Sequence, residues 1–466
     1  NFRGLKEDTA EVIARAKASG VEYLVNVGVG ETLDETAAAV RLAQSHPNVF
    51  ATVGIHPHEA AKAVDPDLAR LEEMAGLPKV VAVGEVGLDY YYEHSPREIQ
   101  QARLKEFVRL ARRVNLPVIL HIREAFEEAY EIVGAEGGFD GKGVVHCFTG
   151  TKEWADKFRQ QGFFISFSGI ITFKKSTALQ EVVRHLPIES MLVETDAPYL
   201  APEPYRGKTN EPAYVVKTAE AIAALKKLSV GDVARITARN TRDLFDLPIE
   251  FADDVAKIAY AIRDSLYLNI TNRCTIACVF CPKFDDWMVK GHYLRLRREP
   301  TVDQIWEAIG APSPYQEVVF CGYGESLIRL EVVKQVSKFL KDNGVYVRID
   351  TDGQANLFHG RNIVPELTGL IDELNISLNA QDSQTYNKLC GSVWGEKGYN
   401  AIIEFAKAAK LSVPPIPKIV FSVVDLLSID KEKCKQIADE IGIELKIRPY
   451  YEQEYVSPFL SGRGLG

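Results

Sequence analysis

Three cysteines of the chain lie within one short segment of its second half, TNRCTIACVFCPK. Cys274, Cys278 and Cys281 have the spacing C-x3-C-x2-C, which lets one loop bring three thiolates to three irons of a 4Fe–4S cluster and leaves the fourth iron open. Buried thiols or a zinc site are the alternatives. Structural zinc normally takes four ligands, and no histidine or fourth cysteine stands close by in the sequence, so the spacing favours the 4Fe–4S cluster.

Four ionisable residues of the first half follow strand-like segments. Glu85 lies in VGEVGLDY, His121 in ILHIRE, His146 in VVHCFTG and Asp196 in VETDAPYL. Two imidazoles and two carboxylates on one rim of a barrel suit divalent zinc, manganese or magnesium and the activation of water. A single histidine in such a segment is more often a core residue, but four polar residues at equivalent strand ends favour a metal site.

The first half alternates nearly continuous apolar segments, typical of buried parallel strands, with amphipathic helical patterns. This alternation predicts an α/β fold, a TIM-type (β/α)8 barrel whose first strand is missing from the sequence. The chain begins instead in a helix, at about Lys6 to Ser19, that leads to the second strand of such a barrel. The seven expected strands begin at Val21, Val49, Val80, Pro117, Gly143, Phe163 and Met191.

A long amphipathic helix is expected between the third and fourth of these segments. It begins with Ser95 in a capping position, followed by Pro96 and, three residues after the serine, Glu98. This pattern is typical of a helix N-terminus, so the helix is predicted to begin at Ser95.

The alternation restarts after a short acidic connector, IEFADD. Six further strands predict a partial (β/α)6 barrel that is open on one side. We therefore expect a first domain over residues 1–247, a linker over 248–257 and a second domain over 258–466. The six strands begin at Ser265, Glu317, Val345, Glu373, Lys418 and Glu444.

The composition is that of a globular protein, with 46% hydrophobic and 26% charged residues. The net charge of −9 argues against a strongly cationic surface, but a metal site can hold phosphate without help from bulk charge. The sequence has neither a run of eighteen apolar residues nor a signal pattern at its start, which predicts no membrane span. Seven cysteines, three of them clustered, suit a reducing cytoplasm better than a disulfide framework.

The cysteine motif resembles that of the radical S-adenosylmethionine (SAM) superfamily, in which an aromatic residue precedes the last cysteine. The resemblance implies that the open iron binds SAM, that SAM is reductively cleaved to a 5′-deoxyadenosyl radical, and that a flavodoxin- or ferredoxin-type donor supplies the electron. CGYGES resembles the family's loop at the methionyl ammonium, where glycine allows a close backbone approach. The residues implied to bind SAM are Phe280, Gly322, Gly324, Glu325, Asp350, Asp352, Asn356, Ser377 and Asn379.

The first half resembles the TatD family of metal-dependent deoxyribonucleases over nearly all of the region up to Leu247. The matching segments are GIHPHEA, GEVGLDYYYEHSPRE, HCFTGT, ETDAPYLAP and YRGKTNEPAYV. The resemblance implies that Glu85 bridges metal ions, that His121 and His146 are imidazole ligands, and that Asp196 is a ligand that orients or deprotonates the attacking water.

The same resemblance implies further residues around the site. His56, His58 and Arg123 would lie near the substrate phosphate, and Glu194 would lie on the rim. The family also uses an H-x-H pair on its first strand, which is absent here, and we expect the native chain to continue upstream of Asn1 with a strand that carries it. His94 has no evident partner and is interpreted as a surface residue.

These patterns predict a bifunctional enzyme, a phosphodiester or nucleotide hydrolase joined to a radical SAM catalyst. Both would act on one nucleotide-derived substrate that contains phosphate, as a nucleotide or DNA does. One alternative is a radical SAM enzyme whose TatD-like barrel is a non-catalytic binding or scaffold module. The other is a nuclease whose cluster domain senses redox state or recognises a partner.

Overall fold

The computed structural model describes residues 8–449 apart from 31, 64, 252–254, 285 and 312–313. The chain divides into two compact units whose boundary lies between Ile249 and Glu250. Each unit has its own hydrophobic core and its own seven-stranded sheet. No helix among the described residues is long and apolar enough to cross a membrane.

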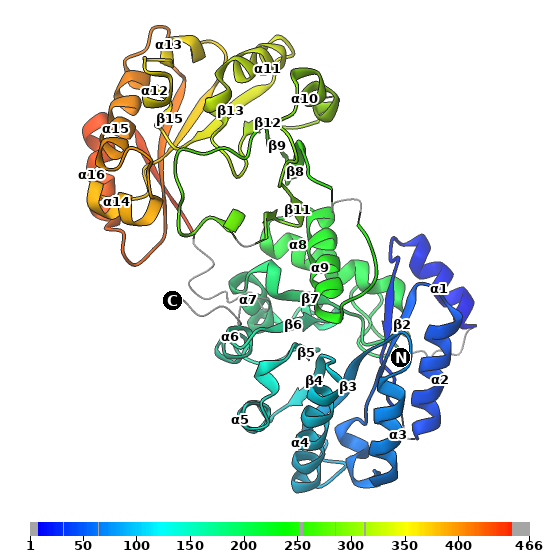
Figure 1. The fold of residues 1–466 in the computed structure, drawn as a ribbon. Coiled ribbons are helices and arrows are strands. Elements are labelled where there is room, and N and C mark those ends of the chain that lie inside the picture. The colour runs from blue at the N-terminus through cyan, green and yellow to red at the C-terminus, as the bar shows by residue number, and fades with distance from the viewer. Residues whose placement is uncertain are drawn as a thin grey trace. The chain divides into compact units, whose positions relative to one another are not determined.

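Seven parallel strands form the sheet of the first unit and follow one another in chain order. The sheet curls, and helices follow the strands around its outer side (Figure 1). The TIM-type α/β architecture predicted from the sequence is thus confirmed, with all seven expected strands. These are β1 (Leu24–Asn26), β2 (Val49–Val53), β3 (Val80–Asp89), β4 (Val118–Arg123), β5 (Gly143–His146), β6 (Phe163–Phe167) and β7 (Met191–Val193).

The helices of the first unit cover the sheet and close its core. The predicted start of the long helix was wrong, because the helix begins at Arg97 with Pro96 as its N-cap residue. The Ser95 hydroxyl instead donates to the carbonyl of His58, at 2.8 Å, and accepts from the amide of Ala61, at 3.0 Å. The helices are α1 (Thr9–Ala18), α2 (Leu33–Ser45), η2 (Pro57–Lys62), α3 (Asp65–Ala75), α4 (Arg97–Val114), α5 (Phe126–Ala135), η3 (Gly138–Asp140), α6 (Lys152–Gln160), η4 (Gly169–Thr172), α7 (Thr177–His185), η5 (Ile188–Ser190), η6 (Pro212–Tyr214), α8 (Val215–Lys226) and α9 (Val230–Phe245).

The two faces of this sheet are both apolar. Neighbouring residues along one strand, such as Phe164 and Ile165, belong to different core clusters, because successive side chains of a strand point to opposite faces. The smaller cluster is completed by Leu244 and Phe245 at the end of α9. Burial on both faces leaves the strand ends as the place where polar side chains can gather, which is where barrel sites lie.

Six parallel strands form most of the second sheet, as predicted for the partial barrel, and their order is β16-β15-β14-β13-β12-β9. An additional strand, β8, pairs antiparallel with β9 and was not predicted, because its four residues show no clear alternation. A two-stranded ribbon, β10 with β11, stands apart from this sheet. The strands are β8 (Ala259–Ile262), β9 (Ser265–Leu268), β10 (Met288–Val289), β11 (His292–Tyr293), β12 (Glu317–Phe320), β13 (Tyr346–Thr351), β14 (Glu373–Ser377), β15 (Lys418–Val424) and β16 (Glu444–Arg448).

The helices of the second unit pack against the apolar face of its sheet. Leu374 and Ile376 of β14 belong to the main cluster, while Asn375 between them does not, so the opposite face of this strand is polar. The helices are η8 (Pro282–Phe284), α10 (Val302–Ile309), η9 (Ser326–Arg329), α11 (Leu330–Asp342), α12 (Ala355–His359), α13 (Val364–Leu367), α14 (Ser383–Cys390), α15 (Glu396–Lys410) and α16 (Lys431–Ile441).

Candidate functional site

The carboxyl ends of the first sheet gather the residues that the sequence singled out in this half. His56 and His58 lie at the start of η2, just after β2, and Glu85 lies within β3. His121 lies in β4, His146 ends β5, and Asp196 follows β7. Because parallel strands end on one edge of a sheet, these side chains come from five segments to one place.

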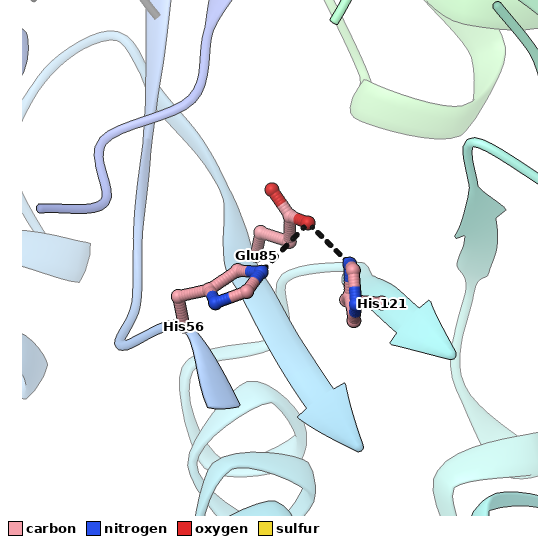
Figure 2. A group of neighbouring side chains, drawn as sticks. All are labelled: His56, Glu85 and His121. Atoms are coloured by element: carbon pink, nitrogen blue, oxygen red, sulfur yellow. Dashed lines mark hydrogen bonds and ion pairs between the residues drawn. The ribbon is translucent and has the colours of Figure 1, made fainter. Parts of the chain in front are cut away.

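Glu85 stands at the centre of this group (Figure 2). Its Oε1 atom lies 2.9 Å from Nδ1 of His121, 3.4 Å from Nε2 of His146 and 3.5 Å from Nε2 of His56. The Glu85 side chain is only 10% exposed. One largely buried carboxylate oxygen therefore faces three imidazole rings, a set of donors that can hold a cation.

Asp89, which the sequence analysis did not single out, holds the far side of His121. Its Oδ2 atom lies 3.1 Å from Nε2 of His121 and 2.9 Å from Nε2 of His58. A carboxylate on one ring nitrogen fixes the tautomer and leaves the other nitrogen, here Nδ1 of His121, to face Glu85. Asp89 lies four residues after Glu85 in the same strand, and that spacing was the available signal, since strand residues an even number apart share a face.

Glu194 binds His146 at Nδ1, whereas Asp89 binds His121 at Nε2. Its Oε2 atom lies 2.8 Å from Nδ1 of His146 and accepts a 2.6 Å hydrogen bond from the hydroxyl of Ser166. The Nε2 atom of His146 is then directed at Glu85 and lies 3.8 Å from Oδ1 of Asp196. All four residues expected to bind metal therefore lie in one group.

The buried charges of this group shift one another's pKa values. Burial alone would raise the pKa of Glu85, but His146, His121 and His56 outweigh it and hold that pKa well below the usual range. Burial opposes protonation of His121 too, yet Asp89 and Glu85 raise its pKa to about 8. Burial, with the charge of Glu85, raises the pKa of Asp196 to about 6. A cation that binds here must therefore displace protons from histidine.

Gly87 lets two strands approach closely beside the site. Its φ is +148°, and a Cβ atom there would lie 1.9 Å from the carbonyl oxygen of His121. Such a contact is impossible without moving β3 or β4, so glycine is required for His121 to stand beside Glu85.

Outside this group, Arg123, Tyr91, Tyr92 and His94 form the rim of the site. The Arg123 guanidinium lies 4.1 Å from the ring centre of Tyr91 and 4.7 Å from that of Tyr92. His94 is an exposed residue, as interpreted from the sequence, but its ring stacks on Tyr92 and lies 4.6 Å from that of His58. Arg123, expected near a substrate phosphate, thus lies on this rim.

The donor set fits a divalent ion. His56, Glu85 and His121 each offer one ligand atom, and these atoms lie within 4.8 Å of one another; the same is true of His146, Cys147 and Glu194. Nitrogen and carboxylate oxygen donors together suit zinc or manganese and admit magnesium. Cys147 was not singled out from the sequence, and burial raises the pKa of its thiol well above the usual range.

Cys274, Cys278 and Cys281, the cysteines of the C-x3-C-x2-C motif, lie in one loop between β9 and β10. The loop is pinned at its backbone, where the amide of Ala277 donates to the carbonyl of Cys390 at 2.8 Å and that of Val279 to Leu389 at 2.9 Å. The groups of three ligand atoms within 4.8 Å of one another, among the residues described, are both in the first unit. A 4Fe–4S cluster takes each thiolate on a different iron, so its three thiolates do not have to meet at one ion.

Cys390 lies beside this loop at the end of α14. The thiols of Cys278 and Cys390 hydrogen-bond to each other, which together with burial raises the pKa of Cys278. Burial also raises the pKa of Cys274. These thiols are protonated in the absence of iron, so loading of the loop must release protons.

The CGYGES segment packs directly under the cysteine loop. A Cβ atom on Gly324 would lie 2.2 Å from the carbonyl oxygen of Thr271, and one on Gly322 would lie 2.5 Å from Oδ1 of Asn269. The amide of Glu325 donates to the carbonyl of Arg273 at 2.7 Å. Glycine at both positions therefore allows the contact between the end of β12 and residues 269–273, which lead into the cysteine motif.

Glu325 is buried rather than free on the surface of this segment. Its two carboxylate oxygens accept from the amides of Leu327, at 2.9 Å, and Asp352, at 2.6 Å. Burial and the neighbouring Asp352 raise the pKa of Glu325 well above its usual range, and burial raises that of Asp352. Thr275, next to the first cysteine, donates to Asp352. These two carboxyls thus tie three strand ends to the cysteine loop.

The remaining residues expected to bind SAM differ in whether their side chains already make hydrogen bonds. Asp350 accepts from Arg348 and Asn375, and Ser377 accepts from Arg448 at 3.5 Å. The Oδ1 atom of Asn379 is buried with no hydrogen-bond partner in the described part of the chain, which leaves an acceptor for a bound group.

Asn356 and Phe280 make contacts within the second unit. The Asn356 amide bonds Asn362 and the amide of Ile363, so both of its ends are used within its own loop. Phe280 is partly buried against the main core of the second unit.

Comparison with known proteins agrees with both halves. The family described as TatD related DNase matches residues 1–246, and the Radical SAM superfamily matches residues 268–441. The uncharacterized metal-dependent hydrolase YabD of Bacillus subtilis is 41% identical over 238 residues, which cover 51% of this chain and 92% of that protein. The 3′-5′ ssDNA/RNA exonuclease TatD of Edwardsiella piscicida is 35% identical over 246 residues, which cover 52% of this chain and 94% of that protein.

A solved structure matches the same half. The crystal structure of YJJV, a TatD homolog from Escherichia coli K12, has a TM-score of 0.50 and 30% sequence identity, and the match covers 53% of this chain and 95% of that one. The chain belongs to the TatD related DNase family of metal-dependent hydrolases and carries a radical SAM domain behind its hydrolase domain.

Proposed function

We propose that the chain is a bifunctional enzyme in which residues 1–247 hydrolyse phosphodiesters or nucleotides with divalent zinc, manganese or magnesium, and residues 258–466 reductively cleave SAM. The observation that carries the hydrolase proposal is the single Glu85 oxygen that faces three histidine rings. The similarity to a protein named as a 3′-5′ ssDNA/RNA exonuclease supports nucleic acid as the substrate class.

In the hydrolase half, Glu85, His121, His146 and Asp196 would hold the metal, and a bound divalent ion lowers the pKa of water and polarises a phosphoryl oxygen. Asp196 lies next to this space with its pKa raised to about 6 by burial, so its carboxylate can take a proton from an attacking water near neutral pH. His56 and His58 would contact a substrate phosphate, with Arg123 at the rim.

The test of this half is phosphodiester hydrolysis by the purified chain after removal of metal. Addition of Mn²⁺, Zn²⁺ or Mg²⁺ is expected to restore release of mononucleotides from single-stranded oligonucleotides. His121→Ala should abolish this activity, whereas His185→Ala should not, because His185 pairs with Asp156 on helix α6, away from this group. Absence of hydrolysis with every metal, while SAM is still cleaved, would leave the barrel as a binding or scaffold module.

In the second half, Cys274, Cys278 and Cys281 would hold a 4Fe–4S cluster. When bound, the cluster supplies an open iron for SAM and the electron that cleaves it. Gly322 and Gly324 would let the backbone approach the methionyl group, and Glu325 with Asp352 would hold that backbone in place. Asn379 would offer its unpaired Oδ1 to the bound SAM.

The test of this half is anaerobic reconstitution with iron and sulfide, followed by reduction and addition of SAM. We expect about four irons per chain and formation of 5′-deoxyadenosine, with a flavodoxin or ferredoxin as the natural donor. A stoichiometric zinc without labile iron would contradict the proposal.

We further propose that both halves act on one nucleotide-derived substrate, because they are joined in one chain.

A further inference from the structure

Two exposed aromatic rings stand at the edge of the hydrolase group. Tyr91 and Tyr92 lie just after β3, separated from it by the buried Tyr90, and they are 54% and 51% exposed. Their rings meet edge to face with centres 4.8 Å apart. Two large neighbouring rings left in water gain nothing from burial, so their position calls for a partner that covers them.

These rings are held in a fixed place relative to the site. The Oδ1 atom of Asp89 accepts from the amides of both Tyr91, at 3.0 Å, and Tyr92, at 2.9 Å. The other oxygen of the same carboxylate bonds His58 and His121. One buried carboxylate therefore sets the distance between the exposed rings and the histidines of the proposed metal site.

A cation lies against the same rings. The Arg123 guanidinium stands over Tyr91 and Tyr92, and among the residues that the structure describes it makes no hydrogen bond or ion pair. Its five N–H donors are thus available to an anion while its plane is kept in position by the rings. His94, stacked on Tyr92 with its ring nearly parallel, at 4°, extends the aromatic surface.

A further exposed ring follows the last strand of the sheet. Tyr199 is 71% exposed, and its amide donates to the carbonyl of Asp196 at 2.9 Å. Its own carbonyl accepts from the buried Asn210 at 2.6 Å. Exposed rings are therefore tied to residues of the site at both β3 and β7.

Exposed rings beside Arg123 and the proposed metal site fit single-stranded nucleic acid, which offers both bases and phosphates. Bases of a single strand stack on aromatic side chains without regard to sequence, while cationic groups follow the backbone. A base-paired duplex keeps its bases stacked on one another and offers no face to Tyr91 or Tyr92.

Resting on the proposed hydrolase function, we propose that Tyr91 and Tyr92 stack a nucleobase next to the scissile phosphate and that Arg123 contacts a backbone phosphate. These two rings, called here the tyrosine platform, would make the site select unpaired strand ends. Tyr199 would stack a second base on the other side of the site.

The binding experiment uses the full chain, treated with EDTA so that nothing is hydrolysed, and fluorescein-labelled hexathymidylate. We expect Tyr91→Leu/Tyr92→Leu to weaken binding by about tenfold, since one stacked base contributes about 1–3 kcal/mol. The Phe/Phe variant should bind like the wild type because it keeps both ring faces. Tyr23→Leu is the control, since Tyr23 is 38% exposed but precedes β1, at the opposite end of the strands.

A second oligonucleotide, in which the bases are replaced by abasic residues, separates stacking from general damage. The Leu/Leu variant and the wild type should bind it equally weakly. Equal binding of hexathymidylate by wild type and Leu/Leu, equal losses for both oligonucleotides, or no binding by the wild type would overturn the platform.

The kinetic experiment keeps this proposal distinct from the hydrolase proposal. With Mn²⁺ present, the Leu/Leu variant should raise KM for hexathymidylate about tenfold and leave KM for the abasic strand unchanged. A wild-type chain that binds the strand but hydrolyses nothing would reject the hydrolase and keep the platform. Hydrolysis with an unchanged KM in the variant would reject the platform alone.

Discussion

The two halves of the chain assemble their ligands in different ways. In the hydrolase half, histidines and carboxylates come from five segments, and their side chains already contact one another across the ends of the strands. In the radical SAM half, all three thiols come from one loop, and it is the backbone of that loop that is fixed. The first site is set by topology, whereas the second is set by the docking of a single segment.

This difference has a physical consequence for how each site responds to the loss of its inorganic partner. The hydrolase residues neutralise one another, since buried glutamate and aspartate face protonated histidines. In the cysteine loop, by contrast, the hydrogen bond to Cys390 and burial raise the pKa of the Cys278 thiol, and burial raises that of Cys274. We therefore expect a hydrolase site that keeps its geometry without metal and a cysteine loop that depends on iron.

The largest expected effect is on the cysteine loop. Replacement of Cys274, Cys278 and Cys281 by alanine should remove essentially all bound iron and all formation of 5′-deoxyadenosine, because no other thiolate set is available. Iron, sulfide and 5′-deoxyadenosine are the quantities to measure. Cys434→Ala is the matched control, since this buried cysteine lies on α16. Phosphodiester hydrolysis should persist in the triple variant, and its loss would show that the halves are not independent.

The next largest effect should fall on hydrolysis. His121→Ala or Asp196→Ala should lower kcat/KM by more than about a hundredfold, because even the loss of an outer partner of a metal ligand costs about 10–100-fold. Formation of 5′-deoxyadenosine should be unchanged in both variants. Equal losses of both activities in these variants would argue for one shared site rather than two.

Most of the fold and many residues of the two sites could be predicted from the sequence, because the patterns that mark them are periodic or local. Continuous apolar segments predicted the thirteen parallel strands of the two sheets but not the antiparallel β8, and the cysteine spacing marked the loop. Polar residues at the strand ends, such as Glu85 and His121, were found because parallel strands end at one edge. The start of α4 was missed because the Ser95 side chain bonds the neighbouring η2 segment rather than its own helix.

What the sequence could not supply are contacts between side chains far apart in the chain. Asp89 was missed because its even spacing from Glu85 indicates only a shared face of the strand, and does not reveal that its carboxylate binds two histidines. The hydrogen bonds that Asn356 makes with Asn362 and Ile363 in its own loop were likewise not visible in the sequence. Which ring nitrogen of His121 or His146 faces Glu85 depends on Asp89 and Glu194, and such pairing has no sequence periodicity.

A smaller effect on metal affinity is expected for Asp89 and Glu194, which orient the histidine ligands but are not themselves expected to bind the metal. Asp89→Asn and Glu194→Gln keep the size of each side chain but remove the charge that orients His121 and His146. Each should weaken metal binding by about 10–100-fold, measured by titration of the metal-free protein with Zn²⁺. Asp140→Asn is a matched control, because the side chain of Asp140 lies outside this group and pairs with the exposed Arg112 at 3.5 Å. Zinc affinity that is the same in all three variants would show that the outer carboxylates do not position the ligands.

The smallest expected effect is the response of the metal-free hydrolase half to pH. Burial disfavours the charged ring of His121, but hydrogen bonds to Asp89 and Glu85 outweigh burial and raise its pKa from 6.5 to about 8. A proton held more tightly in the folded than in the unfolded protein stabilises the fold. That stability is fully present below pH 6.5 and is lost as the pH rises from 6.5 through about 8. Its size is about 2 kcal/mol, since one pKa unit corresponds to about 1.4 kcal/mol.

Urea unfolding of the EDTA-treated chain between about pH 6 and pH 9 measures this contribution. Trp154 is the tryptophan of the first unit, so its fluorescence reports that unit alone once Trp287, Trp306 and Trp394 are changed to phenylalanine. The free energy of unfolding of this unit should fall across the range, and His121→Gln should flatten the fall because glutamine does not titrate. If the two slopes are equal, His121 is not the group that holds the proton, and mutual neutralisation no longer explains why this site is formed without metal. If the free energy of unfolding falls steeply with pH in the protein that keeps His121 but not in His121→Gln, the charges of the hydrolase site hold it together without metal. The cysteine loop differs, because burial there raises the pKa of the Cys274 thiol.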